Sequence, residues 1–194
     1  MTFLNYFFFK RSITKMLVFV FASSMSIASM AVTERDLLHA AIDGDVEVVR
    51  SALQEGISAN SRSADTTTAL QWATQGNYIE IAQLLLSNGA DAVTTNRYGV
   101  TAAALAAENG SAEIMTMLLS AGVNPNQAMP EGETLLMTAA LTGDAATVRV
   151  LLEKGADPNH RELSRGQTAL MWAAGNNNAD AIRVLAEHDV NISV

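Results

Sequence analysis

Apolar and polar positions along the chain repeat with a spacing of 33 or 34 residues, and this period predicts the architecture. Each period opens with a short apolar cluster that ends in small residues, followed by a Gly or Asn and, twelve residues later, by a second turn residue. The first set is Gly44, Asn77, Gly110, Gly143 and Asn177; the second is Gly56, Gly89, Gly122 and Gly155, with Asp189 in the fifth position. Self-similarity at this period predicts a solenoid of stacked units, in which no unit can bury its apolar face alone.

Each unit is predicted to hold two helices and a hairpin finger. The first helix contains paired small residues such as Ala106 and Ala107, which let a neighbouring helix approach closely. The second helix, for example residues 79–86, has apolar side chains at helical spacing. Gly or Asn between the helices tolerates the left-handed conformation that often ends a helix. The polar stretch after each second helix, such as residues 94–99, is typical of a turn or hairpin, so we predict an all-α fold.

This repeat resembles the ankyrin repeat. Residues 168–174 read Thr-Ala-Leu-Met-Trp-Ala-Ala where the family has Thr-Pro-Leu-His-x-Ala-Ala, and residues 151–159 match its closing Leu-Leu-x-x-Gly-Ala-Asp-x-Asn. No unit has the Pro of the motif, and Ala102 and Ala169 stand in its place, so we expect a less rigidly fixed helix start. The resemblance implies an ankyrin-type α-solenoid of helix-turn-helix repeats with short hairpin fingers, in five units at approximately residues 34–60, 61–93, 94–126, 127–159 and 160–194.

Residues 1–31 form a separate segment with the pattern of a secretory signal peptide. Three cations precede an apolar run that starts at Met16 and ends in small residues. We expect cleavage after Ala31, which would leave an ankyrin repeat domain of residues 32–194 in the periplasm or outside the cell. The apolar run of 16 residues is shorter than the roughly 20 that span a bilayer, and an uncleaved membrane anchor is the alternative.

Composition narrows the class of partner. After residue 31 the chain holds nine Lys or Arg against 20 Asp or Glu, a net charge near −11, and its cations are scattered. Proteins that bind nucleic acid or anionic membranes cluster their cations, so we expect neither partner, and a basic face of a protein is the better match. The chain has no Cys, which excludes structural disulfides and a lipid-modified N-terminal Cys.

Residue patterns that support catalysis are sparse. The three His, at His39, His160 and His188, have no second His or carboxylate at metal-ligand spacing. The sequence contains neither a nucleophile elbow nor a phosphate-binding Gly loop. Acidic pairs such as Asp43 with Asp45 are typical of solvated loops. We therefore expect no enzymatic activity, no metal ion and no cofactor.

The resemblance implies that a partner binds the concave side, formed by the fingers and the first helices. A variable position within the first-helix motif holds His39, Trp72, Leu105, Thr138 and Trp172 in turn. Aromatic residues and Arg dominate binding hot spots. The predicted partner-binding set combines these positions with finger tips: Trp72, Arg97, Tyr98, Leu105, Thr138, Arg161, Ser164, Arg165 and Trp172. For the two Trp the alternative is packing that stiffens the stack, and one ring can serve both purposes.

Two further features concern the last finger and the ends of the array. The finger at residues 159–168 is one residue longer than that at 126–134 and is the most cationic patch after residue 31; insertions in repeat proteins often fall on the binding face. Residues 33–36 fit a capping box, and the weaker apolar pattern of the last helix fits a capping repeat.

These features together favour an exported protein-binding module. One interpretation is a periplasmic or secreted scaffold that holds or protects a client protein. The alternative is an inhibitor or immunity-type protein that blocks a secreted enzyme or toxin. We expect a monomer with a protein partner, without nucleic acid, and without membrane contact beyond the signal peptide.

Overall fold

The computed structural model describes residues 32–188, which contain ten helices in five consecutive pairs. The first helices of the pairs are α2 (Glu34–Asp43), α4 (Ala69–Gln75), α6 (Ala102–Glu108), α8 (Leu135–Thr142) and α10 (Ala169–Gly175). The second helices are α3 (Val46–Gln54), α5 (Ile79–Ser87), α7 (Ala112–Ser120), α9 (Ala145–Glu153) and α11 (Ala179–Ala186). The predicted signal peptide with its cleavage site, and Asp189 with the end of the fifth unit, lie outside the described residues.

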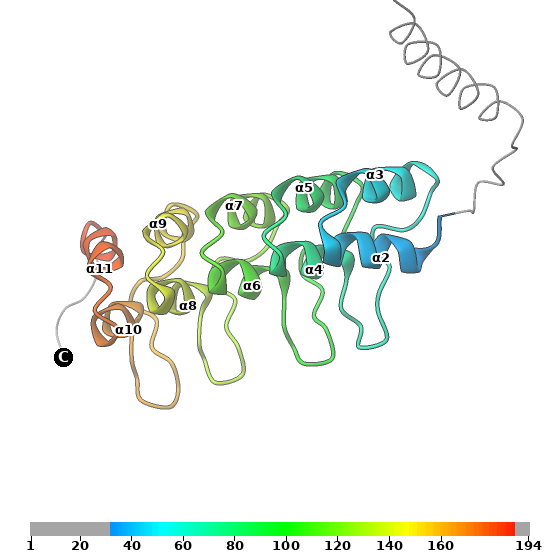
Figure 1. The fold of residues 1–194 in the computed structure, drawn as a ribbon. Helices are drawn as coiled ribbons and strands as arrows, with labels where there is room; N and C mark the ends of the chain where they lie inside the picture. The colour runs from blue at the N-terminus through cyan, green and yellow to red at the C-terminus, as the bar shows by residue number, and fades with distance from the viewer. Residues whose placement is uncertain (1–31, 189–194) are drawn as a thin grey trace, which may run out of the picture. The chain divides into compact units, whose positions relative to one another are not determined.

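The helices stack in two parallel rows, as Figure 1 shows. One row holds the first helices and the other the second helices, and the loops that connect successive pairs all project in the same direction beside the first-helix row. These loops are the predicted fingers: finger 1 (residues 61–67), finger 2 (94–100), finger 3 (127–133) and finger 4 (160–167). The arrangement confirms the predicted all-α solenoid.

Each first helix begins after a Thr that caps it. The hydroxyl oxygens of Thr33, Thr68, Thr101, Thr134 and Thr168 each accept the backbone N–H three residues ahead. At Thr33 the side chain of Asp36 accepts the cap's own N–H at 2.8 Å, which confirms the predicted capping box. An N-cap contributes about 1 kcal/mol, so these helices have a defined start without the family's Pro.

The turn between the two helices of each pair is left-handed. Gly44, Gly110 and Gly143 have φ of +79°, +63° and +82°, and the two Asn that replace Gly, Asn77 and Asn177, have φ of +54° and +59°. This confirms the prediction for the turn positions, because Asn is the non-Gly residue that tolerates this conformation best.

Hydrogen bonds of Asn side chains join neighbouring helix pairs along the stack. The Asn60 side chain donates to the Gly89 carbonyl at 2.9 Å and accepts the Asp91 N–H at 2.8 Å. Asn126 makes the equivalent two bonds, at 2.9 and 2.7 Å, to Gly155 and Asp157. These bonds recur because each polar loop lies against the loop of the next unit, and they fix the register of the stack.

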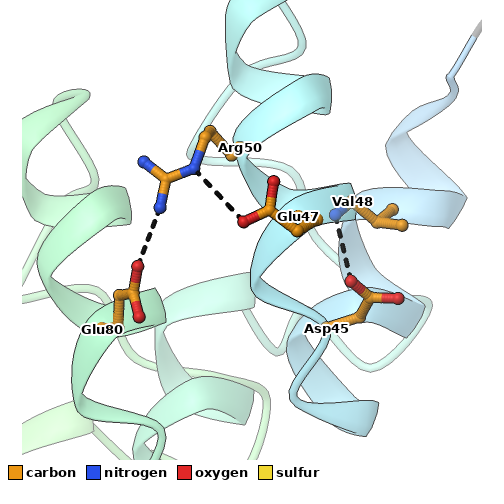
Figure 2. Close-up of polar contacts among 5 residues, drawn as sticks. All are labelled: Asp45, Glu47, Val48, Arg50 and Glu80. Carbon is orange, nitrogen blue, oxygen red and sulfur yellow. Dashed lines mark hydrogen bonds and ion pairs between the residues drawn. The ribbon is translucent and has the colours of Figure 1, made fainter.

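Ion pairs on the second-helix row are exposed. Figure 2 shows Arg50 of α3 with its Nη2 2.8 Å from Oε1 of Glu80 on α5, and its Nε 3.8 Å from Oε1 of Glu47. Beside them, Asp45 caps α3 by accepting the Val48 N–H at 3.1 Å. The Arg50 and Glu80 side chains are 38% and 63% exposed, so the pair contributes little stability.

Candidate protein-binding surface

The four fingers and the exposed positions of the first helices form one surface, which we call the inner face. In fingers 1 to 3 an isolated antiparallel bridge joins the start of the finger to the Thr cap of the next helix. The bridged pairs are Arg62 with Thr68, Thr95 with Thr101, and Ala128 with Thr134. Each of these three Thr residues therefore caps a helix with its side chain and pairs with the finger through its backbone. These contacts fix the backbone of the inner face.

The predicted variable position does not provide an exposed row of side chains. His39 is exposed and Trp72 and Trp172 are half-buried, but Leu105 and Thr138 are only 8% and 7% exposed. The expectation that Leu105 and Thr138 are exposed is wrong, and their role as partner-binding residues stays a prediction. Both residues lie on helices that are packed between two other first helices, α6 between α4 and α8 and α8 between α6 and α10.

A regular row of exposed residues lies instead at the end of each first helix, at the two positions that precede the left-handed turn. They are exposed in all five pairs: Ile42 and Asp43, Gln75 and Gly76, Glu108 and Asn109, Leu141 and Thr142, Gly175 and Asn176. None of these residues was predicted from the sequence as a partner-binding residue. The sequence feature that could have identified this row is its variation: the two residues differ from unit to unit, whereas the residue just before them is Ala or Thr in every unit.

At finger 2 the two predicted residues have different roles. The Arg97 guanidinium donates to the Ala64 carbonyl of finger 1 at 3.0 Å, and the Arg97 N–H donates to the Asp65 carbonyl at 3.2 Å. Arg97 thus ties two fingers together. Tyr98 is 72% exposed at the tip and is free to contact a partner.

Finger 4 is organised around the carboxylate of Glu162, which is only 4% exposed. This carboxylate accepts the Ser164 N–H and hydroxyl, both at 2.5 Å, and the N–H groups of Arg165 and Gln167 at 2.8 and 3.0 Å. These bonds, from the Ser164 hydroxyl first and then the Gln167 N–H, lower the pKa of Glu162 from its ordinary value of 4.5 to about 2. The long finger is therefore a rigid loop around an ionised carboxylate.

Of the predicted residues in finger 4, Arg165 is the one whose side chain makes no hydrogen bond or ion pair within residues 32–188. Ser164 donates its hydroxyl to Glu162, and the Arg161 guanidinium donates to the Gly166 carbonyl at 2.9 Å. Arg165 makes no ion pair within residues 32–188. Leu163, which was not predicted, is 78% exposed at the tip. The folded finger determines these roles, and spacing alone does not show them.

The three His do not converge on a site. The His160 ring lies with Nε2 3.0 Å from the Gly132 carbonyl oxygen, His188 lies with Nδ1 3.0 Å from the Val184 carbonyl oxygen, and His39 is exposed on α2. Within residues 32–188 no three His, Asp or Glu gather where they could hold a metal ion, and no helix there is long and apolar enough to cross a membrane.

Comparison with known proteins identifies the repeat. A family model described as ankyrin repeats (3 copies) matches residues 12–96, 37–129 and 103–194. No curated protein matches the sequence. Ankyrin repeats generally mediate protein–protein interactions and are typically non-catalytic. The matches span most of the chain and agree with the helix pairs and fingers described above, and the chain belongs to the ankyrin repeat family.

Proposed function

We propose that the protein is an exported binding module whose inner face holds a protein partner, in the periplasm or outside the cell, as a scaffold that holds or protects a client. The proposal rests on the location of the large apolar side chains that are exposed to solvent. Of the six exposed ones among the described residues, four belong to the inner face: Ile42, Tyr98, Leu141 and Leu163, from 42% to 78% exposed. They are distributed along the inner face from α2 to finger 4, where a partner lying along the array would cover all four.

The export part of the proposal rests on the pattern of residues 1–31. N-terminal sequencing of the protein from its native host is expected to find Val32, or a residue next to it, at the start of the chain. An intact Met1 recovered with the membrane fraction would contradict cleavage and favour a membrane anchor.

The inner face is tested by affinity capture from the native host with matched variants of the full chain. Ile42→Asp with Leu141→Asp places two charges on exposed apolar positions of the inner face. Gln83→Glu with Ser120→Asp places two charges on exposed positions of α5 and α7, in the second-helix row. A partner retained by the second variant and lost by the first supports the proposal; equal loss or equal retention contradicts it.

A second candidate is an inhibitor or immunity-type protein that blocks a secreted enzyme or toxin. The rigid finger 4, which presents Leu163, favours it, because a preorganised loop enters an active site at a low entropic cost. A single partner at one-to-one stoichiometry, whose activity is lost in the complex, supports the inhibitor. Several partners that stay active support the scaffold.

A further inference from the structure

The inner face contains a hollow of about 360 Å³ between finger 4, α8 and α10. Its apolar wall consists of Leu141, Met171 and Trp172, and Arg165 and Gln167 of the finger contribute polar groups. Leu141 belongs to the preceding helix pair, so the hollow spans two repeats. An occupant with both an apolar and a polar part therefore fits it.

Arg165 is the single charged residue among those that line the hollow, and no carboxylate lines it. Within the described chain Arg50, Arg149 and Arg183 have a carboxylate partner, whereas Arg165, like Arg35, Arg62, Arg97 and Arg161, has none. Its backbone is nevertheless fixed, because the Arg165 N–H donates to Glu162 at 2.8 Å. The hollow thus contains an uncompensated cation on an ordered loop.

The other fingers show that this cation is particular to finger 4. The residue three positions before the Thr cap is Asp65 in finger 1, Tyr98 in finger 2, Glu131 in finger 3 and Arg165 in finger 4. In finger 1 the carboxylate of Asp65 ties its own loop, accepting from the hydroxyls of Ser63 and Thr67. In finger 4 the carboxylate of Glu162 holds the loop together by accepting the Ser164 and Arg165 N–H groups. The side chain of Arg165, at the position equivalent to Asp65, is not needed for this and lines the hollow.

We propose that the hollow binds an aspartate or glutamate side chain from an extended segment of the protein partner, with a neighbouring apolar side chain against Trp172 and Met171. This rests on the proposed function, in which the inner face holds a protein. The planar guanidinium fork matches a carboxylate in a bidentate geometry. The Gln167 side chain, which makes no hydrogen bond within the described residues, supplies a further donor. Because two successive repeats line the hollow, a segment that runs along the stack can pass through it.

The test selects short peptides from a random library displayed against the full chain, then measures their dissociation constants as synthetic peptides with blocked ends. We expect an acidic residue next to an apolar one in the selected set. Arg165→Gln in the protein and carboxylate-to-amide replacement in the peptide should each weaken binding by about tenfold, with little further loss when combined. Arg62→Gln, the same loss of charge at an exposed residue of finger 1 outside the hollow, should leave the affinity within about twofold.

Several outcomes overturn the proposal: no acidic residue in the selected peptides, additive losses, equal loss in Arg62→Gln, or selection only of peptides that require a free C-terminal carboxylate. If the peptides bind independently of Arg165 but are lost in the Ile42→Asp, Leu141→Asp variant, this inference fails and the proposed function stands. If neither peptides nor captured proteins depend on the inner face, both fail. Circular-dichroism melts of each variant exclude unfolding as the cause.

Discussion

Helices α6 and α10 have the same length of seven residues and similar small-residue sequences, but their surroundings differ. In α6 every residue from Ala102 to Ala107 is buried, whereas in α10 only Ala169 and Ala173 are. The cause is position in the stack: α6 packs against both α4 and α8, while α10 packs against α8 and its own partner α11. The same motif therefore encodes a two-sided contact in the middle of the array and a one-sided contact at its end.

The largest effect should come from enlarging the second small residue of the motif. Ala107→Leu in α6 and Ala140→Leu in α8 each put a larger side chain at a position that is 0% exposed, and should lower the free energy of unfolding by about 1–3 kcal/mol. The equivalent Ala174 of α10 is exposed, so Ala174→Leu should change it by less than about 0.5 kcal/mol. Urea denaturation of the three variants measures the contrast, and similar losses at all three positions would show that α10 is packed on both sides.

The left-handed turns that follow α6 and α10 should also differ in how much a substitution destabilises them. Gly110 follows α6 with φ of +63°, and an added Cβ would lie 2.9 Å from Cβ of Asp144 in the next pair. Gly110→Val should therefore cost about 1–3 kcal/mol through strain and crowding. Asn177, the equivalent residue after α10, has φ of +59° and no following pair among residues 32–188, so Asn177→Val should cost only the strain, about 1 kcal/mol. Thermal melts that rank Asn177→Val as the more harmful change would contradict this account.

Local rules of the sequence predict the parts of the fold that depend on local chemistry. The Gly and Asn turn positions and the capping box at Thr33 are confirmed because each is set by the conformation of a few adjacent residues. Prediction of the inner face was only partly successful. The burial of Leu105 and Thr138 was not predicted because it depends on which helices stack against theirs, a fact of tertiary structure.

Finger 4 shows the same limit more clearly. Its extra length and its cations are visible in the sequence, but the role of each residue is not. Glu162 is a charged residue that spacing would place in solvent, yet the loop folds around it and leaves it 4% exposed. This arrangement separates Arg165, which faces the hollow, from Arg161, which bonds within the finger.

The stability that finger 4 contributes should depend on pH, and finger 3 provides the comparison. The pKa of Glu162 is lowered from 4.5 to about 2 in the folded protein, so its ionised form stabilises the fold above pH 4.5. That contribution is lost progressively as the pH falls from about 4.5 to about 2, because the unfolded chain then binds the proton more readily. Glu162→Gln should lower the melting temperature near neutral pH and make it less dependent on pH in this window.

The exposed Glu131 of finger 3 gives the control for that experiment, since Glu131→Gln removes the same charge without removing these bonds. Melting curves recorded at a series of acidic pH values test both variants. If Glu162→Gln and Glu131→Gln had the same pH profile, the tie within finger 4 would contribute nothing to the stability of the fold.

A small net effect is expected for the indole nitrogens of Trp72, in the second pair, and Trp172, in the last. Both rings are half-buried against the core, and both Nε1 atoms are buried without a hydrogen-bond partner among the described residues. Trp→Phe removes some packing area, which destabilises the fold. It also removes a buried N–H without a partner, which stabilises the fold, because such a group costs about 1–3 kcal/mol. The two terms oppose each other, so each variant should stay within about 1 kcal/mol of the wild type in urea denaturation.

Binding separates the two roles considered for these Trp residues. If the rings only stiffen the stack, Trp72→Phe and Trp172→Phe should bind a captured partner as the wild type does. If a partner reaches the indole N–H when it binds, affinity should fall by about tenfold while stability stays near that of the wild type. A loss of stability well above about 1 kcal/mol would contradict the account in which the buried N–H has no partner.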